Sequence, residues 1–111
     1  LGDSVAMFTL AQIYHDGVGV QKNHSRAMEL WEQAAGLGHA ASMFKLGQMN
    51  GGKQNYTKAV EWFQEAADHG WVEAMFNLGY MYYRGVGVQK NNAKALELLP
   101  KAADLGNADA M

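Results

Sequence analysis

The sequence predicts an all-α protein, an α–α superhelix (solenoid) of three antiparallel helix-pair repeats. Two observations predict this fold. Residues 17–23 recur letter for letter as residues 85–91. The pair Met-Phe recurs at positions 7, 43 and 75, and the pair Ala-Ala at positions 34, 66 and 102. A repeat of this length is one supersecondary unit that cannot bury its apolar face alone, so neighbouring units are expected to stack.

The first helix of each repeat is predicted from apolar spacing. In the first repeat Ala6, Leu10, Ile13 and Tyr14 share one face of a helix with 3.6 residues per turn. A small residue follows the leucine of this face in every repeat, which lets the partner helix approach closely; these residues are Ala11, Gly47 and Gly79. The first helices are expected over residues 3–15, 40–50 and 72–84.

The second helices are expected over residues 24–37, 56–69 and 92–105. An asparagine stands ahead of each helix and is expected to cap it through its side-chain oxygen; these are Asn23, Asn55 and Asn91. A glycine is expected to end each helix in the left-handed conformation; these are Gly38, Gly70 and Gly106. The aromatic residues of this helix are expected in the core; they are Trp31, Trp62 and Phe63.

Pro100 lies inside the last of these helices. It removes one hydrogen bond and crowds the carbonyl of Leu96, at a cost of about 3 kcal/mol in a regular helix. We expect a kink there, or a helix that tolerates the strain.

The linkers differ between the repeats. Gly17 and Gly19 indicate a turn with two positive φ angles, because the segment lacks the lysine pattern and the preceding strand of a phosphate-binding loop. The middle repeat is four residues shorter, and the loss falls at residues 50–55, where Asn50 takes the tyrosine position. We expect a shorter first helix in that repeat and a notched surface.

Length and composition limit the class of protein. The chain has 111 residues, a net charge of −2, 49% hydrophobic residues and no cysteine. It is predicted to be one solenoid segment, with repeats at about 3–38, 39–70 and 71–106, while 107–111 open a further repeat. No basic run indicates a nucleic-acid partner. No apolar run of about 20 residues indicates membrane insertion. No charged start followed by an apolar stretch indicates a signal peptide, and the compartment stays open.

The repeat resembles the Sel-one-like repeat (SLR), a relative of the tetratricopeptide repeat. The family pattern joins an alanine and an aromatic residue, Leu-Gly, a tyrosine, Gly-x-Gly-Val, a polar cap, Lys-Ala, Ala-Ala and a closing glycine. In the third repeat it is carried by Ala74, Phe76, Leu78, Gly79, Tyr82, Gly85, Gly87, Val88, Asn91, Lys94, Ala95, Leu98, Leu99, Lys101, Ala102, Ala103 and Gly106. The resemblance covers the whole chain and implies a right-handed superhelix with adaptor or scaffold roles. Family members occur in the bacterial cytoplasm and envelope and in the eukaryotic endoplasmic reticulum.

Binding residues are expected at positions where the repeat pattern does not fix the type of amino acid. On the first helices such positions form one stripe, and stacking is expected to make that stripe concave. The predicted partner-binding residues are Thr9, Gln12, Asp16, Lys45, Gln48, Asn77, Tyr80 and Arg84, bordered by Phe8, Phe44 and Phe76. A protein or peptide partner suits this mixed polar and aromatic surface. The alternative is that the stripe is merely solvated.

Other functional features of the sequence are weaker. No catalytic group, metal site or cofactor is expected, since no two histidines have the spacing of a metal pair on a helix. Glu29, Glu61 and Glu97 repeat in one frame and indicate a solvated face. Trp71 differs from the residues at the equivalent position of the other repeats, so it either anchors a partner or packs against a neighbouring repeat. A structural segment of a larger protein and, less favoured, a hydrolase are the alternative functions. Uncapped ends also predict self-association.

Overall fold

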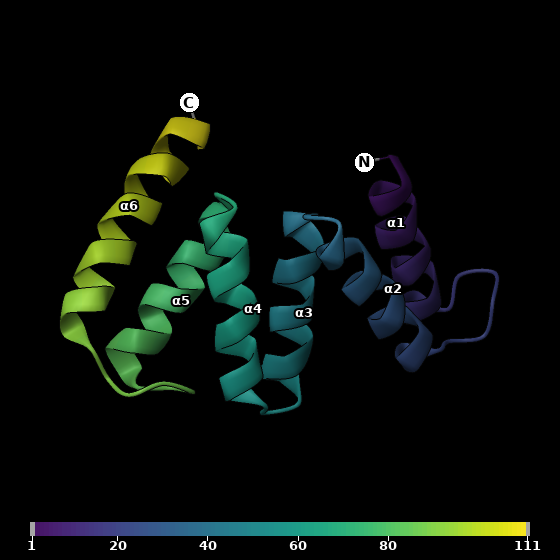
Figure 1. Cartoon of the computed structure of the whole chain (residues 1–111), viewed down its shortest axis with the longest axis horizontal. Coiled ribbons are helices and arrows are strands. Elements are labelled where there is room, and N and C mark those ends of the chain that lie inside the picture. The colour runs from purple at the N-terminus through teal and green to yellow at the C-terminus, as the bar shows by residue number, and fades with distance from the viewer. Residues whose placement is uncertain (1, 111) are drawn as a thin grey trace.

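The computed structural model is a row of six helices and describes residues 2–110 of the chain, with side chains for residues 3–106. The helices are α1 (Gly2–Asp16), α2 (His24–Gly36), α3 (Ala40–Gly52), α4 (Tyr56–Asp68), α5 (Val72–Arg84) and α6 (Asn92–Ala110). They follow one another along the longest axis, with α1 and α2 toward one end of the molecule and α6 at the other (Figure 1). The predicted all-α solenoid is confirmed.

Each helix packs most extensively against the helix before it and the helix after it in the chain. The core lies along these seams, where Trp31, Leu46 and Leu78 are fully buried. Small residues permit the close packing, as predicted. A Cβ at Gly47 would lie 2.6 Å from Cε1 of Phe63, and a Cβ at Gly79 would lie 2.9 Å from Cδ2 of Leu99.

The predicted helix ends are confirmed in part. The side chains of Asn23 and Asn91 accept hydrogen bonds from the backbone N–H groups of Arg26 (3.0 Å) and Lys94 (3.1 Å). Asn55 precedes α4 but makes no capping bond through its side chain. All three asparagines make an equivalent backbone hydrogen bond. Each donates its N–H to the carbonyl of the residue at the tyrosine position of the first helix. These carbonyls belong to Tyr14, Asn50 and Tyr82.

The glycine prediction is confirmed at Gly38 (φ 88°) and Gly70 (φ 85°) but wrong at Gly106, which lies inside α6. The first two turns are held by backbone bonds from His39 to Ala34 and from Trp71 to Ala66. A glycine permits a left-handed turn but does not impose one. Residues 107–110 continue α6, and Leu1 and Met111 lie outside the described residues. The opening of a further repeat at 107–111 therefore stays a prediction.

The expectation of a shorter first helix in the middle repeat is wrong. Helix α3 has 13 residues, as many as α5, because Gly51 and Gly52 continue the helix. The loss of four residues falls wholly on the linker, which is residues 53–55 here and residues 17–23 and 85–91 in the other repeats. Gln54 makes the tight reversal with φ 63°. The buried side chain of Asn50 donates to the carbonyl of Leu46 (2.8 Å), which supports the end of α3.

Pro100 stays within α6, which continues through it to Ala110. Pro100 itself is exposed, and Leu96, whose carbonyl loses its helical donor, is also exposed. Water can therefore solvate that carbonyl, and the helix tolerates the proline. None of the helices in the described part of the chain combines the length and apolarity needed to cross a membrane.

Candidate functional site

The eight residues predicted to bind a partner lie on α1, α3 and α5, and none of them is buried. We call these eight residues the first-helix surface. Thr9, Asp16, Gln48, Tyr80 and Arg84 are exposed, while Gln12, Lys45 and Asn77 are half-buried. Their exposure leaves them available for contact. That this surface is concave, and that a partner binds to it, stays a prediction.

In the first repeat this surface is a small polar network around Asp16. Gln12 donates through Nε2 to the Asp16 carboxylate (3.2 Å), and His15 donates through Nδ1 (3.1 Å). These two hydrogen bonds, that of His15 first, hold the pKa of Asp16 below its ordinary value. The positive charge of Lys45 on α3 acts in the same direction.

Aromatic rings join the first helices of successive repeats. The His39 ring, just ahead of α3, lies 5.2 Å from the Phe8 ring of α1, measured between centroids. The Trp71 ring, just ahead of α5, lies 6.1 Å from the Phe44 ring of α3. Of the three phenylalanines expected to border the stripe, Phe44 is therefore buried and Phe8 is half-buried. Only Phe76 is widely exposed.

The first-helix surface is most distinctive on α5, where three exposed aromatic residues stand in a row. Phe76 stacks on Tyr80 with ring centroids 6.4 Å apart and planes at 16°, and Tyr80 lies 6.4 Å from Tyr83. Arg84 donates to the Tyr80 hydroxyl (3.0 Å) and lies over its ring, 5.8 Å from the centroid. Lys90 Nζ lies 6.0 Å from the centroid of Tyr83. We call these five residues the aromatic–basic row.

The sequence prediction included Tyr80 and Arg84 but missed Tyr83 and Lys90. Tyr83 stands three residues after Tyr80, a spacing that places the two side chains next to each other on a helix. That spacing was a usable signal. The sequence contains no comparable signal for Lys90, because this residue reaches Tyr83 only through the fold of the linker that follows α5.

An apolar pocket of about 280 Å³ adjoins the row at the seam between α5 and α6. Its lining residues are Tyr83, Asn92, Ala95, Leu96 and Leu99. Tyr83 thus belongs both to the pocket wall and to the aromatic–basic row.

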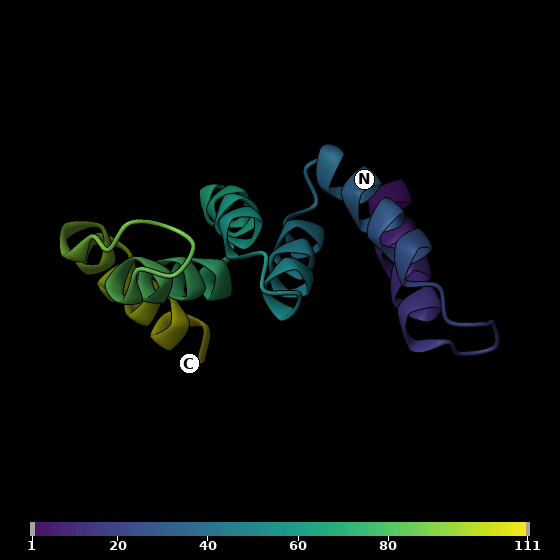
Figure 2. The same ribbon diagram turned by 90° about the horizontal axis from the view of Figure 1, so that it is seen from below.

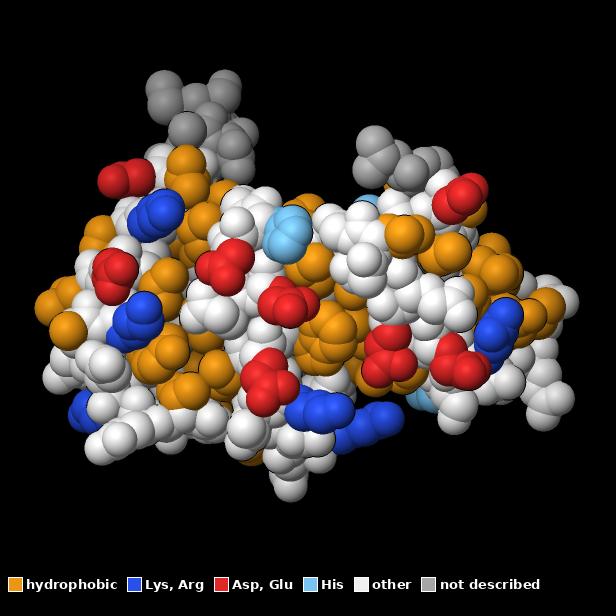
Figure 3. Space-filling model, viewed as in Figure 1, with side chains coloured by type: hydrophobic (Ala, Val, Ile, Leu, Met, Phe, Trp, Pro, Cys, Tyr) orange, Lys and Arg blue, Asp and Glu red, His pale blue; other side chains and the backbone are white. Residues whose placement is uncertain are grey.

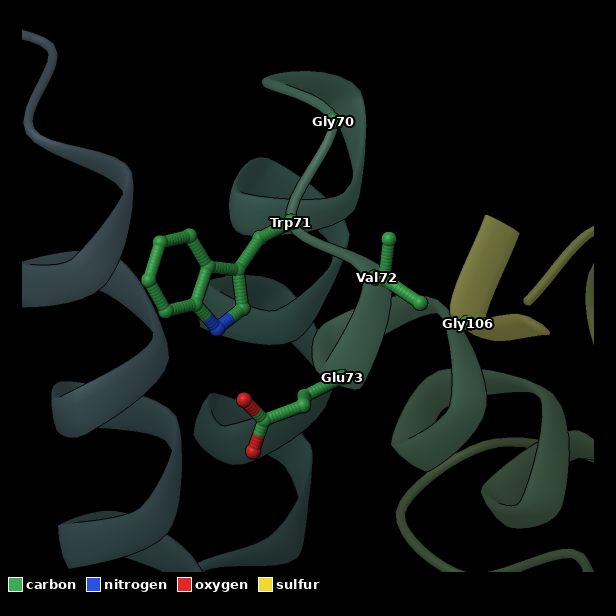
Figure 4. A pocket seen from close by; sticks show the side chains of 5 residues that line it. All are labelled: Gly70, Trp71, Val72, Glu73 and Gly106. Carbon is green, nitrogen blue, oxygen red and sulfur yellow. The ribbon is translucent and has the colours of Figure 1, made fainter. Parts of the chain in front are cut away.

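Trp71 packs against the neighbouring repeat, which is the second of its two predicted roles. Its ring is directed toward α3, away from Val72 and Gly106, in a shallow pocket of about 320 Å³ that also includes Gly70 and Glu73 (Figure 4). Its contact with Phe44 makes it part of the core margin. The indole N–H is buried without an acceptor, so hydrogen bonding does not explain the tryptophan.

The remaining candidates are placed as follows. Glu29, Glu61 and Glu97 are all exposed, in agreement with a solvated face. The fold brings the rings of His15 and His24 to 4.9 Å between centroids, although the two residues are nine positions apart in the sequence. Among the described residues no group of three or more His, Cys, Asp or Glu side chains could hold a metal ion.

Comparisons with known proteins place the chain among helical repeat proteins. The family model described as Sel1 repeat matches residues 4–39, 40–71 and 72–107. No curated protein matches the chain. The match to the family model confirms the predicted resemblance to this family.

Two crystal structures are similar over nearly the whole chain. A Sel1 repeat protein from Oxalobacter formigenes is 32% identical with a TM-score of 0.86, covering 92% of this chain and 44% of that one. A protective antigen present in uropathogenic Escherichia coli strains, displaying an SLR fold, is 31% identical with a TM-score of 0.82, covering 98% of this chain and 24% of that one. The chain therefore spans less than half the length of either protein.

Proposed function

Because the chain belongs to the Sel1 repeat family, we propose that it is a noncatalytic interaction module that binds a peptide or partner protein on the first-helix surface. Sel1 repeat proteins are generally protein-interaction scaffolds and are typically not enzymes. The observation that carries the proposal for this chain is the aromatic–basic row on α5.

The composition of the row suits a binding site. Aromatic residues and arginine are enriched where protein interfaces gain most of their binding free energy. Phe76, Tyr80 and Tyr83 are all about half exposed, so a partner could bury much of each ring. Arg84 is already oriented by its hydrogen bond to Tyr80, so binding would cost it less side-chain entropy.

The charges of the row indicate the kind of partner. Arg84 and Lys90 are the two cations of the row, and both lie over tyrosine rings. A segment that carries carboxylates beside an apolar side chain would match these cations and the adjoining apolar pocket. The affinity for such a segment would fall as salt concentration rises, because exposed charge pairs are screened.

A triple variant tests the proposal. Gln48→Ala, Tyr80→Ala and Arg84→Ala together remove exposed groups of the first-helix surface, so the fold should persist. We expect partners captured by the wild-type chain to be lost by this variant, with the same circular dichroism spectrum and melting temperature. The matched control is Glu29→Gln, Glu61→Gln and Glu97→Gln, which should capture as well as the wild type. Unchanged affinity of the captured partner for the triple variant would contradict the proposal.

A second candidate function is a structural segment of a larger protein whose active part lies elsewhere. The observation that favours it is length, since the chain spans less than half of each similar structure. The two functions predict different results for the isolated chain. An interaction module captures a partner through its first-helix surface, whereas a purely structural segment captures none.

A further inference from the structure

The linker at residues 17–23 brings two histidines together. His15 lies one residue before the end of α1, and His24 is the first residue of α2. The linker loops out beyond these two helix ends, as the two perpendicular views agree (Figures 1 and 2). The two imidazole rings lie 4.9 Å apart between centroids, with their planes at 42°. Spacing along one helix does not reveal this pair, because its members stand on two different helices.

The distance between the two rings suits a shared metal ion. Two imidazole nitrogens that bind one zinc ion at about 2.0–2.1 Å, with a bond angle of about 90–110°, hold their ring centroids about 4.5–5.2 Å apart. The observed separation of 4.9 Å falls inside this range. His24 is exposed and the side chain of His15 is 26% exposed, so an ion could reach both rings from the solvent.

A carboxylate orients one of the two histidines. Nδ1 of His15 lies 3.1 Å from Oδ1 of Asp16. An ionised carboxylate only accepts hydrogen bonds, so Nδ1 carries the proton and the lone pair of Nε2 is left for a metal ion. A histidine that binds a metal commonly donates its other ring N–H to a carboxylate, which fixes the ring and makes it a stronger ligand.

The neighbouring residues hold the His15 ring and set the charge around it. The ring lies 5.7 Å from the ring of Trp31, which is fully buried. Lys45 Nζ on α3 lies 5.7 Å from the centroid of the same tryptophan ring. The charge of Lys45 opposes a bound cation, whereas the adjacent Asp16 carboxylate favours one. The carboxylate is the closer of the two charges, because it contacts His15 directly.

This set of two histidines and a carboxylate occurs only in the first repeat. The linker of the third repeat has the same sequence as residues 17–23. The residues at the three positions are nevertheless Tyr83, Arg84 and Asn92 in the third repeat, and Gly51, Gly52 and Tyr56 in the middle repeat. The helix pair therefore forms without the set, and packing of the repeat does not account for it.

We propose that His15 and His24 bind a divalent transition-metal ion of the zinc type between α1 and α2, with Asp16 as a positioning residue behind His15. Imidazole is a ligand that suits zinc, copper and nickel ions. Among the described residues no group of three or more His, Cys, Asp or Glu side chains could hold an ion, so the protein supplies two ligands and water the others. The ion would tie the end of α1 to the start of α2.

Calorimetric titration of the chain with zinc tests the site. We expect one zinc ion to bind per chain, and more tightly than magnesium, because magnesium is bound through oxygen ligands. Acidic side chains are spread along the length of the molecule (Figure 3). The titration with magnesium measures how strongly these side chains bind a divalent cation through charge alone.

Variants of the three residues test their separate roles. His15→Ala and His24→Ala should each weaken zinc binding to the level of magnesium. Asp16→Ala should weaken it by at least about tenfold, and Asp16→Asn, which keeps an acceptor, by less. The matched control is His69→Ala, because His69 is also exposed and its Nδ1 lies 2.9 Å from the carbonyl oxygen of Glu65. This control should bind zinc as the wild type does.

Circular dichroism without metal checks that each variant is folded, and the exposed position of His24 makes its variant the decisive one. Zinc should also raise the melting temperature of the wild type but not that of His24→Ala, because an ion that binds only the folded state stabilises it. Zinc binding by the wild type that is no tighter than magnesium binding would overturn the proposal. Unchanged zinc affinity in His24→Ala would overturn it as well, and unchanged affinity in Asp16→Ala would overturn the role of Asp16.

Discussion

Single glycines set the distance between paired helices. Gly47 stands inside α3, and its missing side chain makes room for the ring of Phe63 on α4. Gly79 makes the same room for Leu99 on α6. A glycine inside a helix costs about 1 kcal/mol relative to alanine. Close packing of the partner helix offsets that cost.

Replacing Gly47 with alanine should therefore destabilise the fold. The overlap with Phe63 costs about 1–3 kcal/mol, while the gain in helix propensity is about 1 kcal/mol. We expect a net loss of about 1 kcal/mol in the free energy of unfolding by urea. Adding Phe63→Leu should recover part of the loss caused by the alanine. Gly36→Ala is the control, because an added Cβ there would meet nothing within 4 Å. The prediction would be contradicted if Gly47→Ala and Gly36→Ala changed the free energy of unfolding equally.

The Asp16 carboxylate provides a second test at this scale. Its pKa lies below the ordinary value of 3.8, chiefly because of the hydrogen bond from His15 and then that from Gln12. A pKa lowered by folding stabilises the fold above the ordinary pKa, and this contribution is lost as the pH falls through the folded value. In an NMR titration we expect His15→Ala to raise the pKa of Asp16, and Gln12→Ala to raise it by less. The same pKa in the wild type and both variants would refute this assignment.

At the scale of elements, asparagines fix where the second helices begin. Asn23 and Asn91 cap α2 and α6 through their side chains, whereas Asn55 makes only the shared backbone bond. Substitution by alanine should cost about 1 kcal/mol at Asn23 and Asn91 and much less at Asn55. Thermal or urea unfolding of the three single variants measures how much stability each substitution costs. A loss at Asn55 as large as the other two would contradict it.

The two identical linkers allow a comparison in which the local sequence is constant. Gly19 and Gly87 have nearly equal φ angles, 76° and 74°, so alanine is strained at both. Only Gly87 also lies against the backbone of Tyr56. We expect Gly87→Ala to lower the free energy of unfolding by at least about 1 kcal/mol more than Gly19→Ala. The measurement is made at a concentration where the chain is monomeric, and equal losses would show that the linker of the third repeat does not dock.

All six helices were predictable from the sequence, because apolar spacing and flanking Asn and Gly residues mark them. The position of the four-residue loss was predictable, but its effect on α3 was not. Helix α3 keeps its length because Gly51 and Gly52 stay helical and Gln54 reverses the chain. The end of α6 was missed for a related reason, since Gly106 permits a turn that the structure does not take.

At the scale of the whole molecule, the predicted binding positions all lie unburied on three helices. Their spacing was predictable because the repeat frame fixes which residues share a face. The inclusion of Lys90 and the burial of Phe44 were not predictable. The first depends on how the linker after α5 folds, and the second on packing against Trp71 of the next repeat. The different exposure of Leu10 and Leu78 also needed the structure, since the two residues hold the same position in the repeat.

The central claim is that a partner binds on the first-helix surface, and amide hydrogen exchange tests it most directly. The exchange of the chain is compared with and without a partner captured by the wild-type chain. We expect new protection on α1, α3 and α5, strongest around Tyr80 and Arg84, and no change at Glu29, Glu61 and Glu97 on the second helices. Protection confined to the second helices, with α5 unchanged, would contradict the claim.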